Sequence, residues 1–223
     1  MNVEMIPREA EALLDWLELA EALAEGHRGP RAEVGDTFLF REPDTLLSRA
    51  AWIDGMGMAV KTATVFPENP ADHYRTVNGA VNLYTDAHGI LEAILDFHLV
   101  TKWKTAADSL LGARLLARPD SHAILIVGAG NVAISLREAY GALFPDARYL
   151  IWNRTPAGAE AIAAHYPDTL VATDLESAVS SSDIITCATT TREPGDITVF
   201  KNGGGAHLDL MTSRYILEKW RAR

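Results

Sequence analysis

Cysteine is nearly absent from this sequence, because Cys187 is the single cysteine in 223 residues. One cysteine excludes an internal disulfide, and such sparse use is typical of a reducing compartment, so we expect a cytoplasmic protein. No apolar run approaches the length that crosses a bilayer, and the acidic N-terminus lacks the apolar core of a signal peptide. Since Cys187 follows apolar residues, we expect it to be a small core residue.

Positive charge is also scarce. Lysine and arginine total 20 against 30 aspartates and glutamates, which gives a net charge of −10. This balance argues against nucleic acid or an anionic membrane as a partner. The seven histidines show no His-x-x-x-His spacing and have no cysteine set beside them, so the sequence predicts no metal site. A hydrophobic content of 48% with an ordinary charge content indicates a soluble globular protein.

The most informative stretch is residues 123–140, AILIVGAGNVAISLREAY. An apolar run leads into Gly128-Ala129-Gly130, and a helical pattern follows. Strand, glycine turn and helix in this order are typical of a dinucleotide site, where the helix N-terminus faces the phosphates. Gly128 allows the sharp turn, Gly130 lets a pyrophosphate approach the backbone, and Ala133 takes the place of the third glycine. The residues predicted to contact the cofactor here are Gly128, Ala129, Gly130, Asn131 and Val132.

The segments after this turn support the same interpretation over a glycine turn of some other α/β protein. Apolar runs at residues 147–152, 170–172, 183–188 and 206–210 predict strands, and residues 157–165 and 175–179 predict helices. Alternating strands and helices indicate a parallel sheet with right-handed crossovers. We therefore expect an α/β protein with a Rossmann-type sheet.

The region before the turn has a different pattern. A helix is expected at residues 8–25, followed by strands at 36–40, 46–53, 58–66, 80–85 and 90–96. A further helix at 101–117 ends at Arg118-Pro119-Asp120. The sequence thus predicts an α+β domain over residues 1–100, a connecting helix over 101–120 and the dinucleotide-binding domain over 121–223.

The residues at the end of the second Rossmann strand indicate whether a dinucleotide site prefers NAD or NADP. An NAD site would place an acid there to bind the ribose hydroxyls, but this strand ends in Trp152-Asn153-Arg154-Thr155. Arg154 follows Gly130 by 24 residues, where the ribose contact is expected. A guanidinium favours a 2′-phosphate, and Asn153 and Thr155 add hydrogen bonds. We predict NADP(H) over NAD(H), with an ordinary surface charge as the alternative role of Arg154.

An ordered set of motifs resembles one family. KTATVFPEN at 61–69, the hairpin at 78–96, TKWKTAA at 101–107, LARPDS at 116–121, GAGNVA at 128–133 and WNRT at 152–155 occur in this order. Together they resemble the ornithine cyclodeaminase/mu-crystallin family over residues 46–210. The resemblance implies a substrate and dimerisation domain built from both chain ends, an inserted Rossmann domain, and NAD or NADP as cofactor. It also implies a homodimer that acts on an amino acid or a cyclic imino acid.

The resemblance implies roles for several basic residues. Lys61 would lie in the substrate pocket, where it would pair with a substrate carboxylate or carbonyl oxygen, or exchange protons if burial lowers its pKa. A solvated strand-edge lysine is the alternative. Lys104 stands where the family has an arginine that resembles a carboxylate clamp, and a lysine supplies the charge without the planar fork. A surface helix residue is the alternative for Lys104. Arg31 and Arg49 are candidates for further carboxylate contacts.

Three threonines are further candidates for cofactor contacts. The Thr105 hydroxyl could donate to a cofactor phosphate or serve helix packing. Thr189 and Thr190 follow a strand end, where ligands of doubly wound folds lie, so they are candidates to contact the nicotinamide ribose. A hydroxyl-rich loop without a ligand role is the alternative for both.

The sequence departs from the family pattern near its end. The family's catalytic acid follows a pattern that stands here as His207-Leu208-Asp209, and by register it would fall near Arg214, so the acid is missing. We expect a C-terminally shortened member with an incomplete Rossmann sheet, part of whose open edge a helix over residues 215–221 would cover. Two functions remain open: a family enzyme that transfers hydride at the carbon alpha to a carboxylate, by cyclic-imine reduction or cyclodeamination, or a catalytically silent NADPH-binding protein similar to mu-crystallin.

Overall fold

The computed structural model describes residues 3–188 and 204–223. The chain divides into two compact units, one of Met1–Lys104 with Gly203–Arg223 and one of Thr105–Asn202. The first unit therefore contains residues from both ends of the chain, in contrast to the expected assignment of all of 121–223 to the dinucleotide-binding domain.

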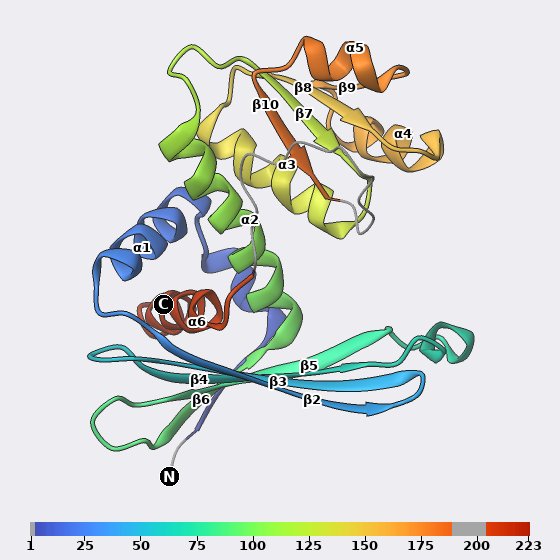
Figure 1. Cartoon of the computed structure of the whole chain (residues 1–223). Helices are drawn as coiled ribbons and strands as arrows, with labels where there is room; N and C mark the ends of the chain where they lie inside the picture. Colours follow the sequence, from blue (N-terminus) through green and yellow to red (C-terminus); the bar gives the residue numbers. More distant parts are fainter. Residues whose placement is uncertain (1–2, 189–203) are drawn as a thin grey trace. The chain divides into compact units, whose positions relative to one another are not determined.

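The first unit is built on a six-stranded sheet in the order β1-β6-β5-β4-β3-β2 (Figure 1). All neighbours pair antiparallel except β1, which runs parallel to β6. The expected hairpin-rich region is thus confirmed. The strands are β1 (Glu4–Ile6), β2 (Glu33–Arg41), β3 (Asp44–Ile53), β4 (Gly57–Val65), β5 (Val77–Tyr84) and β6 (Leu91–Asp96).

Helices accompany this sheet. They are η1 (Arg8–Leu13), α1 (Trp16–Arg28), η2 (Asn69–Asp72), the first part of α2 (Phe97–Leu116), and α6 (Ala206–Arg221). The single helix expected at residues 8–25 is wrong, because Leu14 is extended and Asp15 begins a new helix. The Asp15 carboxylate accepts the backbone N–H groups of Leu17 and Glu18 at 2.8 and 3.0 Å, which satisfies two otherwise unpaired donors.

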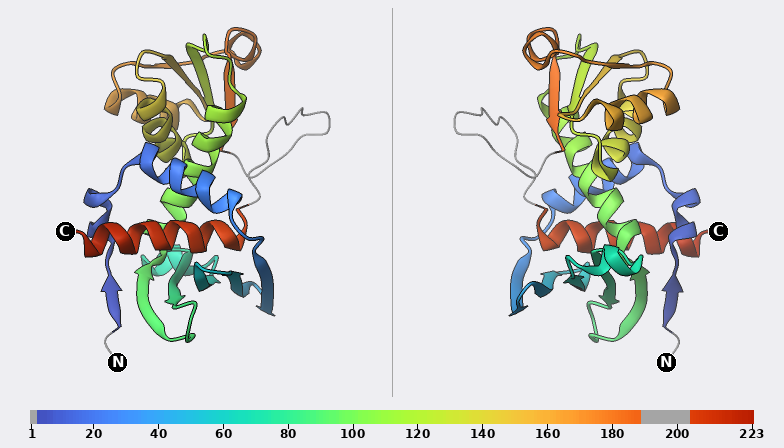
Figure 2. Two further views of the ribbon diagram at one scale, coloured as in Figure 1. Left: turned by 90° about the vertical axis from the view of Figure 1, so that its left-hand side faces the viewer. Right: turned by 90° about the vertical axis from the view of Figure 1, so that its right-hand side faces the viewer.

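The strand expected at residues 206–210 is also wrong, because these residues begin α6. The short alternation of apolar and polar residues there fits a strand, but Leu208, Met211 and Tyr215 lie at helical spacing and are all buried. Helix α6 crosses the six-stranded sheet (Figure 2) and contacts β3, β4, β5 and α1. Residues 215–221 are helical as expected, but they belong to the first unit and not to the unit that contains the parallel sheet.

Strand β4 places a lysine in this interior. Its side chains alternate, and Ala59, Lys61 and Ala63 are buried while their neighbours are half-exposed. Lys61 therefore points to the side of the sheet that α6 covers.

The second unit contains a parallel sheet in the order β10-β7-β8-β9. Its strands are β7 (Ala123–Val127), β8 (Arg148–Trp152), β9 (Thr169–Val171) and β10 (Ile184–Cys187), with helices α3 (Asn131–Leu143), α4 (Pro156–His165) and α5 (Leu175–Ser180). The fourth strand lies beside the first, and the second and third follow on the other side. This is the order of one half of a doubly wound dinucleotide-binding fold, as the sequence predicts.

Both faces of the parallel sheet are covered, which explains its continuous apolar strands. Ile126 and Ile151 pack with residues of α3 and α4, whereas Leu125 and Leu150 pack with α5 on the opposite face. Cys187 differs from its expected role as a core residue. It is exposed because β10 borders the sheet in the part of the chain that the structure describes.

None of the described helices is both long and apolar enough to cross a membrane.

Candidate functional site

The turn after β7 is shaped by Gly128. Its φ of 115° lies in the region that side chains rarely adopt, and its N–H donates to the Trp152 carbonyl at 2.8 Å. A Cβ on Gly128 would lie 2.7 Å from the Ala188 carbonyl oxygen. Both the positive φ angle of Gly128 and the adjacent backbone of Ala188 therefore require glycine at this position.

Gly130 leaves space where Gly128 does not. It is the N-cap residue of α3, and a Cβ added to it would meet nothing within 4 Å. The first helical residues, Asn131 and Val132, are exposed. Bare backbone at a helix N-terminus, with unpaired N–H groups and the positive end of the helix dipole, fits the pyrophosphate of a dinucleotide.

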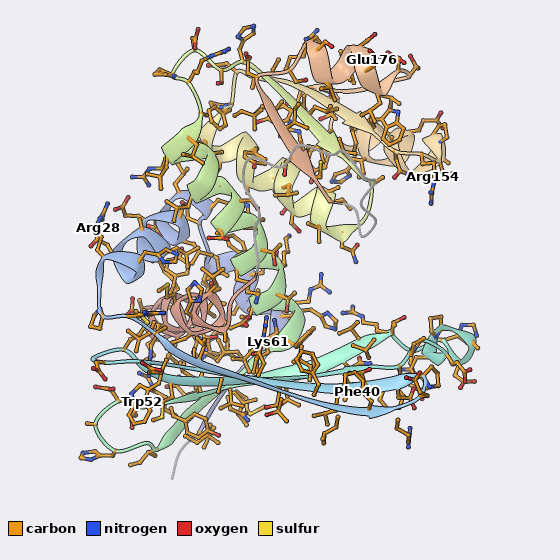
Figure 3. All side chains as sticks on the ribbon, viewed as in Figure 1. Arg28, Phe40, Trp52, Lys61, Arg154 and Glu176 are labelled. Atoms are coloured by element: carbon orange, nitrogen blue, oxygen red, sulfur yellow. The ribbon has the colours of Figure 1, made fainter. Side chains whose placement is uncertain are left out.

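The loop after β8 packs against this turn. A Cβ on Gly158, in the first turn of α4, would lie 3.0 Å from Ala129 Cβ and 3.3 Å from Asn153 Nδ2, so the start of this helix is in close contact with the turn. Asn153 donates to the Thr155 carbonyl at 2.8 Å, which closes the loop around Arg154. Arg154 is exposed (Figure 3). A guanidinium beside the turn can meet the adenosine end of a dinucleotide.

The turn lies at the carboxyl end of the sheet, at the switch point of the topology. The Ala188 N–H donates to the Val127 carbonyl at 2.7 Å, so β7 and β10 end together. In doubly wound folds the ligand crevice lies at such a switch point. The predicted contacts Thr189 and Thr190 lie outside the described residues, and Thr105 is half-buried in α2.

The first unit holds a second group of predicted residues. Lys61 and Lys104 are 6% and 4% exposed, so neither is the surface lysine that the alternative interpretations describe. Lys61 Nζ donates to Thr101 Oγ1 at 2.9 Å and lies 4.7 Å from the centre of the Phe97 ring. Figure 3 labels Lys61 on β4, from which it reaches the start of α2.

A carboxylate of α6 joins the two lysines. Asp209 Oδ1 lies 3.0 Å from Lys61 Nζ and 2.9 Å from Lys104 Nζ, and Asp209 is 1% exposed. A buried ammonium needs such a partner, since its unpaired burial costs several kcal/mol. The three residues form a buried ion cluster, which we call the lysine–aspartate cluster.

Arg49 borders this cluster, but Arg31 does not. Arg49 pairs with Asp36 through two hydrogen bonds at 2.8 and 3.2 Å, and its Nη1 donates to the Gly204 carbonyl at 2.6 Å. Lys104 Nζ donates to the same carbonyl at 3.1 Å. Arg31 is exposed in the link between α1 and β2, and no contact joins it to the cluster.

The surroundings of Lys61 change its acidity. The pKa of Lys61 is lowered from 10.5 to about 8. Burial is the largest cause, the positive charges of Lys104 and Arg49 act in the same direction, and Asp209 opposes the shift. At neutral to mildly alkaline pH this amine is therefore able to release and recover a proton.

Asp209 and Thr101 are neighbours of Lys61 that no pattern in the sequence indicates. Asp209 belongs to the His-Leu-Asp pattern, but it was expected in a strand of the other domain. Arg214, where the family's acid would fall, pairs with Glu92 and donates to the Tyr84 carbonyl at 2.5 Å. Among the described residues, no group of three or more His, Cys, Asp or Glu side chains is placed to hold a metal ion.

The lowered pKa of Lys61 predicts a specific dependence of stability on pH. Between pH 8 and 10.5 the unfolded chain keeps a proton on Lys61 that the folded chain has lost, so the unfolding free energy should rise with pH in this window. We expect this rise in urea unfolding of the wild type and its loss in Lys61→Met. Lys219→Met, which removes a more exposed lysine, should keep it. An equal rise in Lys61→Met would contradict the assignment.

Comparisons with known proteins agree with this fold. A model described as "Ornithine cyclodeaminase/mu-crystallin family" matches residues 50–214. The chain is 44% identical over 208 residues to a Delta(1)-pyrroline-2-carboxylate reductase of Paracoccus denitrificans, which covers 91% of this chain and 66% of the relative. The chain thus spans slightly less than two thirds of that relative's length.

Two solved structures share the fold. The Thermococcus litoralis Delta(1)-pyrroline-2-carboxylate reductase in complex with NADH and L-proline has a TM-score of 0.73 at 24% identity, over 86% of this chain and 64% of that one. An archaeal alanine dehydrogenase dimer with bound NAD has a TM-score of 0.76 at 22% identity, over 85% and 61%. The family match covers most of the sequence, and the structural likeness extends over both units. This chain belongs to the ornithine cyclodeaminase/mu-crystallin family.

Proposed function

We propose that this chain is an NADP(H)-dependent oxidoreductase that reduces a cyclic imino acid such as Delta(1)-pyrroline-2-carboxylate. The observation that carries the proposal is the buried pair Lys61 and Lys104, which offers two ammonium groups to a carboxylate. The similarity to a reductase of this substrate supports it, although the chain spans only 66% of that relative.

The turn of the second unit is the proposed cofactor site. The backbone N–H groups at Gly130, Asn131 and Val132 would hold the pyrophosphate, because a Cβ at Gly130 would enter otherwise open space. A bound nicotinamide supplies or accepts the hydride. The task of this chain's residues is then to position the cofactor and the imino acid.

The preference for the phosphorylated cofactor depends on Arg154. Strand β8 ends at Trp152 and no acid follows it, so the usual acceptor for the ribose 2′-hydroxyl is missing. The exposed Arg154 guanidinium would bind the 2′-phosphate, with Asn153 and Thr155 beside it. The similar solved structures carry NADH and NAD, so this preference is a proposal for this chain alone.

The lysine–aspartate cluster is the proposed substrate site. Lys61 and Lys104 would pair with the substrate carboxylate, and Arg49 would add positive charge at the border. In the reduction, the imine carbon receives the hydride and its nitrogen receives a proton. Lys61 suits the proton transfer, since its pKa of about 8 allows both protonation states near neutral pH.

A second candidate function follows from Asp209. Because its Oδ1 already contacts both lysines, the carboxylate site is filled by the chain itself. This observation favours a protein that binds NADPH without turnover.

We also propose a homodimer, as the family resemblance implies. The face of the six-stranded sheet opposite to Lys61 and α6 exposes two large apolar side chains, Leu39 at 62% and Trp52 at 49%. Exposed apolar side chains at two places on one open face of a sheet favour an interface there.

The cofactor site is tested by Gly130→Ala. The added methyl has room in the fold, so the unfolding free energy should stay within about 0.5 kcal/mol of the wild type. The methyl would obstruct the pyrophosphate, so the Kd for NADPH in calorimetry should rise at least about tenfold. Gly35→Ala, which also adds a Cβ into open space, is the matched control and should leave the Kd unchanged. Unchanged affinity in Gly130→Ala would exclude this turn as the site.

The choice of cofactor is tested by Arg154→Gln. Loss of one charge-assisted contact should raise the Kd for NADPH about tenfold or more and change the Kd for NADH less than about twofold. Arg148→Gln is the control, because Arg148 begins the same strand at the opposite end of the sheet. Tighter binding of NADH than NADPH by the wild type would overturn the preference.

Turnover is tested by the loss of NADPH absorbance with Delta(1)-pyrroline-2-carboxylate. We expect oxidation that requires both compounds and is lost in Lys61→Met, because this change removes the proton donor and one carboxylate contact. NADPH binding without oxidation would contradict the reductase and leave the second candidate function.

A further inference from the structure

Helix α6 carries polar side chains into a closed interior. Asp209, Thr212 and Ser213 are each 1% exposed or less. Asp209 Oδ2 and the hydroxyls of Thr212 and Ser213 have no hydrogen-bond partner. A helix that is buried on most of its faces is normally apolar, and each unpartnered polar group costs about 1–3 kcal/mol. The packing of this helix is therefore stabilised by a few strong contacts and weakened by several unsatisfied groups.

The strongest of these contacts reproduces what a ligand carboxylate would do. A single oxygen of Asp209 receives both ammonium groups, at 3.0 Å from Lys61 and 2.9 Å from Lys104. Its other oxygen has no hydrogen-bond partner among the described residues. The same two lysines are the ones that we propose for a substrate carboxylate. In this structure the carboxylate that contacts both ammonium groups is the side chain of Asp209.

We propose that Asp209 substitutes for the substrate carboxylate, so that α6 closes the lysine site and a carboxylate ligand must displace Asp209 to bind. This inference rests on the proposed role of Lys61 and Lys104 as a carboxylate site. It adds an autoinhibitory contact to that site, and it specifies monocarboxylates as the ligands that compete with this contact.

The segment that enters α6 is held by the same cations. The Gly204 carbonyl accepts from Arg49 Nη1 at 2.6 Å and from Lys104 Nζ at 3.1 Å. A ligand that takes Lys104 therefore weakens both contacts at the N-terminal end of α6. The C-terminal end has its own ion pairs, Lys219 with Glu18 and Arg221 with Glu4 at 2.5 and 2.7 Å. The first turns of the helix are thus the part that opens.

Charge balance supports a negatively charged competitor. Once Asp209 leaves the site, Lys61 and Lys104 lose their buried carboxylate, while Asp36 remains paired with Arg49. Two adjacent buried ammonium groups without an anion are strongly unfavourable. A small carboxylate restores the balance, whereas a neutral molecule of the same shape does not.

The inference is tested by Asp209→Ala with formate and acetate as probes. Thermal unfolding is followed by tryptophan fluorescence, to which Trp16, Trp52, Trp103 and Trp220 contribute from the first unit. We expect about 100 mM formate or acetate to raise the Tm of Asp209→Ala by at least about 3 °C more than that of the wild type. Acetamide, the neutral counterpart of acetate, should give no such difference. A Tm of folded Asp209→Ala that responds to formate no more than the wild type would overturn the inference.

Two control variants locate the effect. Adding Lys61→Met to Asp209→Ala should abolish the carboxylate response, because the anion loses one of its two cations. Glu18→Ala, which removes a carboxylate of α1 that pairs with Lys219 of α6, should show no carboxylate-specific gain. A gain of equal size in Glu18→Ala would point to a general salt effect and contradict the proposal.

If Asp209→Ala does not fold, the wild type supplies the test. Hydrogen exchange of residues 206–213 should become faster at saturating L-proline or formate, while residues 214–221 stay protected. Unchanged exchange in residues 206–213 would overturn the inference. These measurements use no nicotinamide nucleotide. A failure of redox turnover therefore leaves them interpretable, and their failure leaves the reductase proposal to be judged by its own assay.

Discussion

The first unit depends on one electrostatic constraint, the neutralisation of two buried ammonium groups. Lys61 comes from a central strand, Lys104 from α2, and the carboxylate that pairs with both comes from α6. Breaking a buried ion pair by removing one partner typically costs about 3–5 kcal/mol, because the remaining charge stays desolvated. The position of α6 on the sheet is therefore coupled to the protonation and occupancy of the lysine site. Any ligand that competes for these cations also acts on the packing of the helix.

Local patterns in the sequence were sufficient for most of the fold. The run at residues 123–127 and the Gly128–Gly130 turn predict β7 and α3 because strand, turn and helix follow directly from neighbouring residues. The antiparallel hairpins before them were predicted for the same reason. Residues 206–210 were misassigned, because five alternating residues fit a strand as well as a helix and tertiary packing decides between them. Cys187 was misjudged because an apolar strand does not reveal whether it lies at the border of its sheet.

Some residues of the candidate site were also predictable from local sequence, whereas others depend on tertiary packing. The dinucleotide turn was recognisable because its glycines lie within three residues and have distinct geometric tasks. The family resemblance predicts Lys61 and Lys104 as site residues. The structure adds that both are buried and that both contact Asp209. Asp209 could not be predicted as their partner, since it is 148 residues from Lys61 along the chain and its contact exists only after α6 has packed. Arg154 stays a prediction, since its ligand contact depends on charge and loop position alone.

The first unit is built from two segments that are far apart in the sequence. This arrangement affects the order in which the protein can fold during synthesis. The ribosome releases residues 105–188 as one continuous stretch, so the parallel sheet with its helices can form while synthesis continues. The antiparallel sheet is covered only after residues 204–223 have been synthesised. Helix α6 supplies both the Asp209 carboxylate and apolar side chains over β3 and β4. Until then the nascent chain exposes Lys61, Lys104 and the apolar face around them. The early strands therefore keep an incompletely covered apolar face until the last helix has been synthesised.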